Sequence, residues 1–233
     1  MDNKDVLKLI KDEEADYVDI RFTDPRGKMQ HVTFDLSMVD ADLFEHGTMF
    51  DGSSISGWKA INESDMTLMP DPTSATMDPF FAASTMVINC DVLEPSTGEP
   101  YSRDPRQIAT KAEAYLQSTG IADTAYFGAE AEFYVFDDVR FETKQNAGYY
   151  FIDSSEGAWN TGRVEDPNLG YKMRMKGGYF PCPPADKLQD LRTEMLLTLE
   201  NLGIEIEAQH HEVATAGQAE IDMRFKPLLQ MSD

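Results

Sequence analysis

The first third of the chain alternates apolar and polar residues in short runs, a pattern that predicts β-strands. Residues 17–24 and 28–34 both follow a period of two, and the turn-forming segment 25–27 separates them. Two such runs around a short Pro/Gly segment predict a β-hairpin that covers a core with one face. That face is expected to consist of Val18, Ile20, Phe22, Val32 and Phe34.

Further elements complete a small N-terminal domain. Apolar residues spaced as on a helix face open the chain at Val6, Leu7 and Ile10. Additional strands are predicted at 66–69 and 85–92, with Gly- and Pro-rich connections between them. Residues 1–98 are therefore predicted to form an α+β domain.

A turn-rich stretch at residues 93–100 interrupts the pattern and predicts a domain boundary, with the linker at 99–104. The second domain, residues 105–233, is predicted to begin with a helix, because Asp104-Pro105 is a typical helix start. A later helix is predicted near 186–202, where Gly203 stops the apolar stripe.

The segment 127–136 carries the first candidate chemistry. Its odd positions are all apolar, whereas Glu130 and Glu132 share the opposite face of the predicted strand. Carboxylates two residues apart on a strand lie roughly 7 Å from each other, near enough to converge on shared cations. A half-exposed strand with two solvated glutamates fits this segment alone equally well.

A second pair of strands, near 204–212 and 217–225, adds more glutamates. If their hairpin is symmetric about Ala216, Glu212 and Glu220 lie directly opposite each other, which is unfavourable unless a cation lies between them. Clustered carboxylates suit Mg²⁺ or Mn²⁺ better than zinc. Simple alternation places Glu207 and Glu212 on opposite faces, so a β-bulge near His210-His211 is required if both serve one site. We interpret both histidines as hydrogen-bonding strand residues rather than metal ligands.

Composition narrows the class of protein. A net charge of −22 without a basic patch argues against nucleic acid as a partner. Two cysteines without CxxC spacing argue against a disulfide framework or a cysteine zinc site. The sequence shows neither a membrane-length apolar run nor a signal-peptide pattern at its start, so we expect a cytoplasmic protein without membrane contact.

Several long motifs resemble, in order and spacing, those of the glutamine synthetase family, bacterial type I. They cover nearly the whole chain: Phe50-Asp-Gly-Ser-Ser54, Gly128-Ala-Glu-Ala-Glu-Phe133, Tyr149 to Gly162, Gly178-Tyr-Phe-Pro181 and the run from His210 to Glu220. The resemblance implies an α+β fold in which an N-terminal β-grasp domain precedes a catalytic domain built on a partial antiparallel barrel.

The resemblance also implies roles for individual residues. Glu132, Glu212 and Glu220 would hold a first Mg²⁺ or Mn²⁺ ion, and Glu130 would contribute to a second. Three further residues would contact ATP: Glu207, with Tyr179 and Phe225 near the adenosine. Asp51 would bind and deprotonate ammonium in a neighbouring subunit's site, although an aspartate before glycine is more commonly a plain turn residue.

The activity that the resemblance implies is ATP-dependent ligation of ammonia to L-glutamate through a γ-glutamyl phosphate. It further implies a homo-oligomer, a dodecamer of two stacked hexameric rings with active sites between subunits. The family is about twice this length, so we expect the chain to match its N-terminal half and to be inactive and poorly soluble by itself. Two alternatives stay open: a related ligase that joins another amine to glutamate, and a non-catalytic remnant that only binds metal or assembles with full-length subunits.

Overall fold

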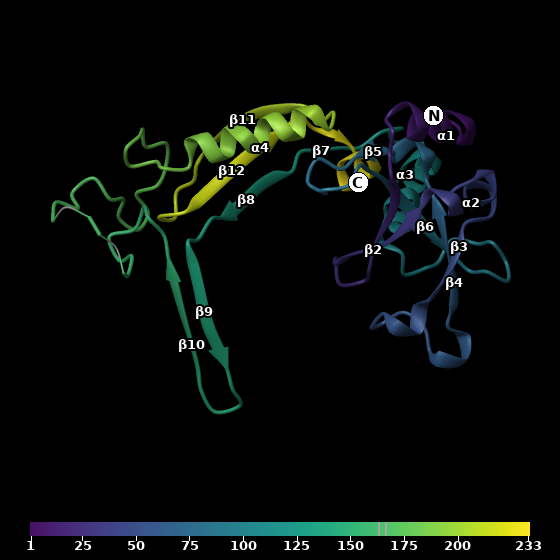
Figure 1. Cartoon of the computed structure of the whole chain (residues 1–233), viewed down its shortest axis with the longest axis horizontal. Helices are drawn as coiled ribbons and strands as arrows, with labels where there is room; N and C mark the ends of the chain where they lie inside the picture. The colour runs from purple at the N-terminus through teal and green to yellow at the C-terminus, as the bar shows by residue number, and fades with distance from the viewer. Residues whose placement is uncertain (163, 166) are drawn as a thin grey trace. The chain divides into compact units, whose positions relative to one another are not determined.

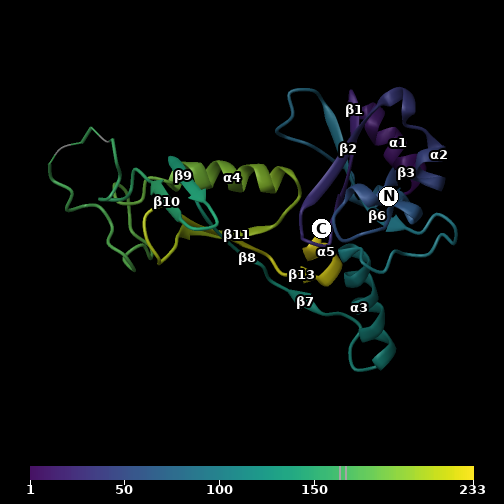
Figure 2. The same cartoon turned by 90° about the horizontal axis from the view of Figure 1, so that it is seen from below.

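The computed structural model describes residues 1–162, 164–165 and 167–233, which form two compact units (Figure 1, Figure 2). The first unit contains residues 1–127 and 226–233, and the second contains residues 128–225. Each unit has its own β-sheet and is described by itself. No helix among these residues is long and apolar enough to cross a bilayer.

A six-stranded mixed sheet forms the centre of the first unit. The strands lie in the order β2-β1-β6-β4-β3, with β5 paired to β6, and only β1 and β6 are parallel to each other. The strands are β1 (Tyr17–Thr23), β2 (Met29–Asp35), β3 (Thr48–Asp51), β4 (Asp65–Pro70), β5 (Thr76–Met77) and β6 (Thr85–Leu93). The helices of this region are α1 (Asn3–Asp12) and α2 (Ala41–His46), with short 3-10 helices η1 (Leu36–Met38), η2 (Gly52–Ser54), η3 (Ile61–Glu63) and η4 (Pro72–Ser74).

The predicted hairpin is β1–β2, and its first strand faces the core as expected. Val18, Ile20 and Phe22 are buried, together with Val6 and Ile10 of α1. The expectation for Val32 is wrong, because its side chain is 39% exposed. The strand β2 is one edge of the sheet, whereas α2 packs on β4 and α1 packs on α2.

The first unit also includes α3 (Pro105–Thr119), the short paired strands β7 (Tyr126–Phe127) and β13 (Lys226–Pro227), and α5 (Leu228–Ser232). The predicted start of α3 is confirmed, since the Asp104 side chain caps the helix by accepting from Arg106 N at 3.1 Å. The predicted linker at 99–104 lies within this unit, and the domain boundary itself stays a prediction.

A three-stranded antiparallel sheet, in the order β11-β12-β8, organises the second unit. Its strands are β8 (Glu130–Tyr134), β11 (Ile206–His211) and β12 (Gln218–Met223), and α4 (Gln189–Asn201) packs against β11. The buried Arg192 joins α4 to this sheet by donating to Gln209 of β11 and to both carboxylate oxygens of Asp186, at 3.1 and 2.6 Å.

A separate hairpin, β9 (Asp138–Thr143) with β10 (Gly148–Asp153), extends away from this sheet (Figure 1). Its aromatic residues are exposed, with Phe141 at 72% and its cross-strand partner Tyr150 at 75%. A long connection, residues 154–188, then leads to α4 without a regular helix or strand among its described residues.

Candidate metal and nucleotide site

Acidic side chains of β8 and β12 lie next to one another on the second sheet, and His210 of β11 lies beside them. Glu220 of β12 pairs with Glu132 of β8 on one side and with His210 of β11 on the other. Two residues further along β12, Asp222 pairs with Glu130. Residues two apart on a strand share a face, so one face of the sheet carries two rows of acidic groups.

These side chains form two candidate cation sites that share Glu220. Potential ligand atoms of Glu130, Glu132 and Glu220 lie within 4.8 Å of one another, and those of His210, Glu212 and Glu220 do so as well. The second group is the less solvent-exposed of the two, because the side chains of Glu212 and Glu220 are only 12% and 10% exposed. The residues that the resemblance assigns to the first ion are thus distributed over both groups, and their assignment to individual ions stays a prediction.

The register of the β11–β12 hairpin differs from the symmetric one that the sequence suggested. His210, not Glu212, lies opposite Glu220, which moves the centre of the turn by one residue. Glu212 still reaches the cluster from the start of the turn, where its backbone N–H donates to Gln218 O at 3.2 Å. Its carboxylate lies 3.6 Å from His210 Nδ1, and Glu220 lies 3.6 Å from His210 Nε2.

The β-bulge is also displaced from its predicted position. The register of β11 shifts between Ile206 and Ala208, so the bulged residue is Glu207 and the pairing around His210-His211 is regular. Simple alternation would have placed Glu207 on the face opposite the other glutamates. With the bulge, Glu207 lines the same pocket as Glu130 and Asp222.

The electrostatics of the cluster favour a bound cation. Burial, together with the neighbouring carboxylates of Asp222, Glu132 and Glu212, raises the pKa of Glu220, and only His210 acts in the opposite direction. Negative charges held together at a partly buried site are unfavourable without a positive charge between them. Because most of the donors are carboxylate oxygens, the cluster fits Mg²⁺ or Mn²⁺.

One amide links the two acidic groups to the turn. Gln218 Nε2 donates to Glu132 Oε2 at 2.8 Å, and Gln218 Oε1 accepts from the backbone N–H of Ala214 at 2.7 Å. The orientation of Glu132 thus depends on the conformation of residues 212–217, which connect β11 to β12.

Two of the three predicted nucleotide contacts are brought together, and the third lies elsewhere. Glu207 and Phe225 line a pocket of about 320 Å³ with Glu130. The exposed Tyr179 instead stacks on Phe180 with ring centroids 4.0 Å apart, and it makes a T-shaped contact with the His210 ring at 5.9 Å. A pocket with an aromatic wall and carboxylates at its rim can take a planar base next to cation-bound phosphates.

Asp51, in the first unit, has the geometry of a turn residue. Its carboxylate accepts from Ser53 N at 2.9 Å, from Ser53 Oγ at 2.6 Å and from Ser54 Oγ at 3.0 Å. The hydrogen bonds from Ser53 and Ser54 hold the pKa of Asp51 below its usual value. The preceding Phe50 packs against both Phe22 and Trp58, which fixes the start of this turn. The carboxylate is exposed and ionised, so it can accept a proton or hold a cation.

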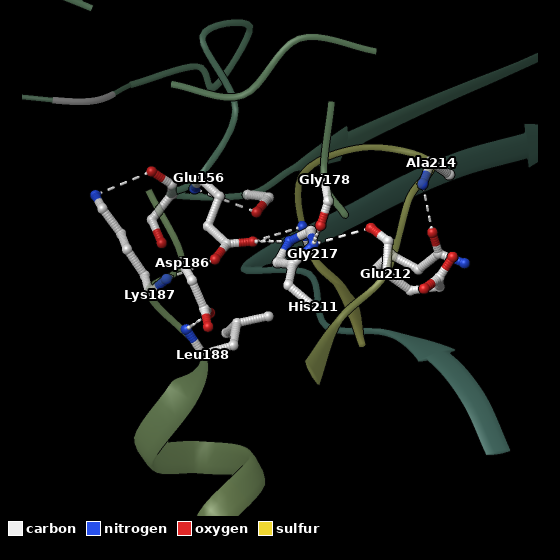
Figure 3. A network of polar contacts seen from close by, with 12 residues as sticks. Glu156, Gly178, Asp186, Lys187, Leu188, His211, Glu212, Ala214 and Gly217 are labelled. Atoms are coloured by element: carbon white, nitrogen blue, oxygen red, sulfur yellow. Dashed lines mark hydrogen bonds and ion pairs between the residues drawn. The ribbon is translucent and has the colours of Figure 1, made fainter. Parts of the chain in front are cut away.

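Sequence reasoning missed three residues of this region. The sequence indicates only a hydrogen-bonding strand residue at His210, but this side chain lies between the carboxylates of Glu212 and Glu220. Asp222, which also lies near His210, is distinguished in the sequence only as a polar position of the predicted strand. Glu156 gave no signal at all, because it comes from the long connection. It forms a buried ion pair with His211, Nε2 to Oε2 at 2.9 Å (Figure 3), which agrees with the hydrogen-bonding role expected for His211.

The pKa values of this pair shift in opposite directions, as expected for an ion pair. Burial alone would lower the pKa of His211, but Glu156 and the carbonyls of Gly178 and Glu212 raise it. Burial would likewise raise the pKa of Glu156, but hydrogen bonds from His211, Lys187 N and Gly217 N lower it. Both shifts favour the charged form of the group concerned.

The fold and the acidic sheet define a class of α+β protein with a candidate two-cation site, and comparison with known proteins identifies the family. Residues 14–95 match the model of the glutamine synthetase β-grasp domain, and residues 102–233 match that of the glutamine synthetase catalytic domain. The chain therefore belongs to the glutamine synthetase family, and the expected fold class is confirmed.

Individual relatives support this assignment. The chain is 62% identical over 231 residues to a glutamine synthetase of Bradyrhizobium diazoefficiens and 54% identical over 234 residues to one of Escherichia coli. These matches cover 99% and 100% of this chain but 49% and 50% of the relatives, so the chain spans about half their length. A cryo-EM structure of Plasmodium falciparum glutamine synthetase superposes with a TM-score of 0.88 at 25% identity, covering 99% of this chain and 46% of that one.

Proposed function

We propose that this chain supplies a metal- and nucleotide-binding face for ATP-dependent ligation of ammonia to L-glutamate, which yields L-glutamine. The observation that carries the proposal is the pair of acidic groups that share Glu220. Identities of 54–62% to relatives named glutamine synthetase support the same reaction.

In this proposal the acidic sheet holds two divalent cations, Mg²⁺ or Mn²⁺. Glu132, Glu212 and Glu220 hold the first of them and Glu130 contributes to the second. All four side chains belong to the two acidic groups that share Glu220, and His210 lies beside Glu220. When bound, such ions neutralise phosphate charge and so assist phosphoryl transfer.

The nucleotide is ATP, which we place next to the acidic groups. Glu207 and Phe225 border the ATP in their shared pocket. Tyr179 stays a proposed adenosine contact, since its ring is exposed near His210.

The reaction proceeds in two steps, because a glutamate carboxylate does not react with ammonia directly. The γ-carboxylate first attacks the γ-phosphorus of ATP, which releases ADP and forms γ-glutamyl phosphate. Ammonia then attacks the carbonyl and phosphate leaves. Asp51 binds ammonium and takes a proton from it, and the carboxylate of Asp51 is ionised and exposed as this role requires.

We further propose that the protein works as a homo-oligomer, a dodecamer of two hexameric rings with active sites between subunits, in the cytoplasm. The hairpin β9–β10 supports an assembly, because an exposed two-stranded hairpin is marginally stable by itself. Its exposed Phe141, Tyr150 and Phe151 are typical of a surface that another chain covers.

The substitution Glu220→Gln tests the shared carboxylate through two opposite effects on stability. Without metal, the variant should be at least as stable as the wild type, since it removes repulsion and Glu220 accepts only long contacts of 3.6 Å. With Mn²⁺ at about one hundred times Kd, the wild type should gain about 2.7 kcal/mol in unfolding free energy and the variant much less.

The matched control is Glu142→Gln, which removes the same charge from the exposed hairpin β9–β10. It should respond to Mn²⁺ as the wild type does in chemical denaturation. If Glu220→Gln and the wild type gain equally from Mn²⁺, the acidic sheet is not the metal site.

A further inference from the structure

Glu156 is an almost fully buried carboxylate that accepts three hydrogen bonds from three separate parts of the second unit. It is 1% exposed. Its Oε2 accepts from His211 Nε2 at 2.9 Å and from Gly217 N at 2.7 Å, and its Oε1 accepts from Lys187 N at 2.6 Å. A buried carboxylate with this set of donors fixes all three backbone segments relative to one another.

His211 extends the network in the opposite direction. Its Nδ1 lies 2.7 Å from Gly178 O and 2.9 Å from Glu212 O, so both ring nitrogens face acceptors and both donate. Figure 3 shows the imidazole between Glu156 on one side and the carbonyls of Gly178 and Glu212 on the other. The second of these carbonyls belongs to a residue of the acidic cluster.

The long connection is held close to the turn 212–217 by backbone contacts as well. Gly178 N donates to Val213 O at 3.3 Å, and Lys176 N donates to Ala214 O at 2.6 Å. A side chain at position 178 has no room, because its Cβ would lie 2.4 Å from Glu212 O and 2.9 Å from the His211 ring. The connection therefore packs directly on the backbone that carries Glu212.

This turn positions both acidic groups. It begins at Glu212, and through Ala214 N and the amide of Gln218 it also orients Glu132. We propose that Glu156 and His211 are positioning residues. They hold residues 156, 176–178 and 187 of the connection against the turn 212–217 and so orient Glu212 and Glu132 for the cations. The inference rests on the proposed metal site.

Glu156→Gln tests this role with little change in shape. A glutamine has one acceptor oxygen, so either Lys187 N or the pair of donors at His211 and Gly217 faces an amide NH₂ group instead. Titration with Mn²⁺, followed by the electron paramagnetic resonance of the free ion, should show a roughly tenfold or larger increase in Kd. Hydrogen exchange at residues 176–178 should slow on addition of Mn²⁺ in the wild type and much less in the variant.

Two further variants keep the test decisive. His211→Gln retains a donor toward Glu156 but loses those toward Gly178 and Glu212, so its Kd for Mn²⁺ should also rise several-fold. Asp19→Asn, in the first unit, removes a buried carboxylate that likewise accepts three side-chain hydrogen bonds. This control variant should lower the free energy of unfolding and leave the Kd for Mn²⁺ unchanged. A loss of stability alone would then not explain a raised Kd in the other two variants.

The possible failures are distinguishable. If the wild type binds Mn²⁺ and both Glu156→Gln and His211→Gln bind it with the same Kd, the pair is only structural and the inference is overturned. If the wild type does not bind Mn²⁺ at all, the proposed metal site fails and the inference fails with it.

Discussion

At the scale of single residues, two buried carboxylates show how environment decides the role of a side chain. Asp19 is fully buried, yet hydrogen bonds from Thr33, His31 and Arg21 outweigh its burial and lower its pKa. Glu220 is nearly as buried, but its neighbours are mostly acidic and its pKa rises. The negative charge of Asp19 is stabilised by hydrogen bonds from other side chains. The surroundings of Glu220 do not stabilise its charge in this way, and a bound cation would do so.

Asp19→Asn should therefore destabilise the first unit by about 2 kcal/mol at neutral pH, because three donors lose an anionic acceptor. The pKa of Asp19 is lower in the folded state than its ordinary value of 3.8, so its contribution is complete above the unfolded-state pKa. It is lost as pH falls through the folded-state pKa. Urea denaturation monitored by Trp58 fluorescence in a Trp159→Phe background should show the deficit of the variant shrinking in acid. A deficit that stays constant down to about pH 2 would contradict this account.

The sequence alone predicted the acidic residues of the site better than their partners. Glu130 and Glu132 share a face because strand alternation requires it, and Glu220 follows the same rule. His210 could not be placed, because its position opposite Glu220 depends on the turn. Glu156 lies 55 residues from His211, and no local pattern relates residues so far apart.

At the scale of elements, the paired strands were predictable and their exact register was not. Periodicity gives the strands of β1–β2 and β11–β12 because apolar side chains must alternate. The turn 212–217 ends instead on a left-handed glycine, Gly217 with φ +84°, and its hydrogen bonds set the register. The position of the bulge has the same status, since the break in alternation between Glu207 and Glu212 indicates a bulge but does not show which residue forms it.

Gly217→Ala should be much more damaging than Gly203→Ala, although both glycines have similar positive φ values, +84° and +83°. Position 203 is open, so alanine there adds only backbone strain of about 1 kcal/mol. At position 217 a Cβ would lie 2.5 Å from Val135 O, which adds about 1–3 kcal/mol and distorts the turn. Denaturation curves and Mn²⁺ titrations of both variants check this. Equal stability losses, or an unchanged Kd in Gly217→Ala, would contradict the role of the turn.

At the scale of the whole molecule, the family assignment explains why the fold class could be predicted from motifs. The β-grasp and catalytic-domain matches cover 14–95 and 102–233, and the chain spans about half the length of its relatives. In our proposal, another subunit covers the aromatic residues of β9–β10 that are exposed in the single chain.

The double substitution Phe141→Ser with Tyr150→Ser should shift the protein to smaller assemblies. The two side chains form a cross-strand pair on the exposed hairpin, so their loss removes apolar area from an interface and not from a core. Light scattering after size-exclusion chromatography measures the mass directly. The control Leu197→Ser changes an exposed apolar residue on α4 and should leave the mass unchanged. An unaltered mass in the double variant would show that the hairpin is not part of the interface.

The most direct test of the account is where divalent ions bind in crystals soaked with Mn²⁺, located by anomalous scattering. We expect two anomalous peaks, the first contacting Glu132, Glu212 and Glu220 and the second contacting Glu130. Peaks only at other positions, with Glu220 and its neighbouring carboxylates turned toward solvent, would contradict the proposed metal site.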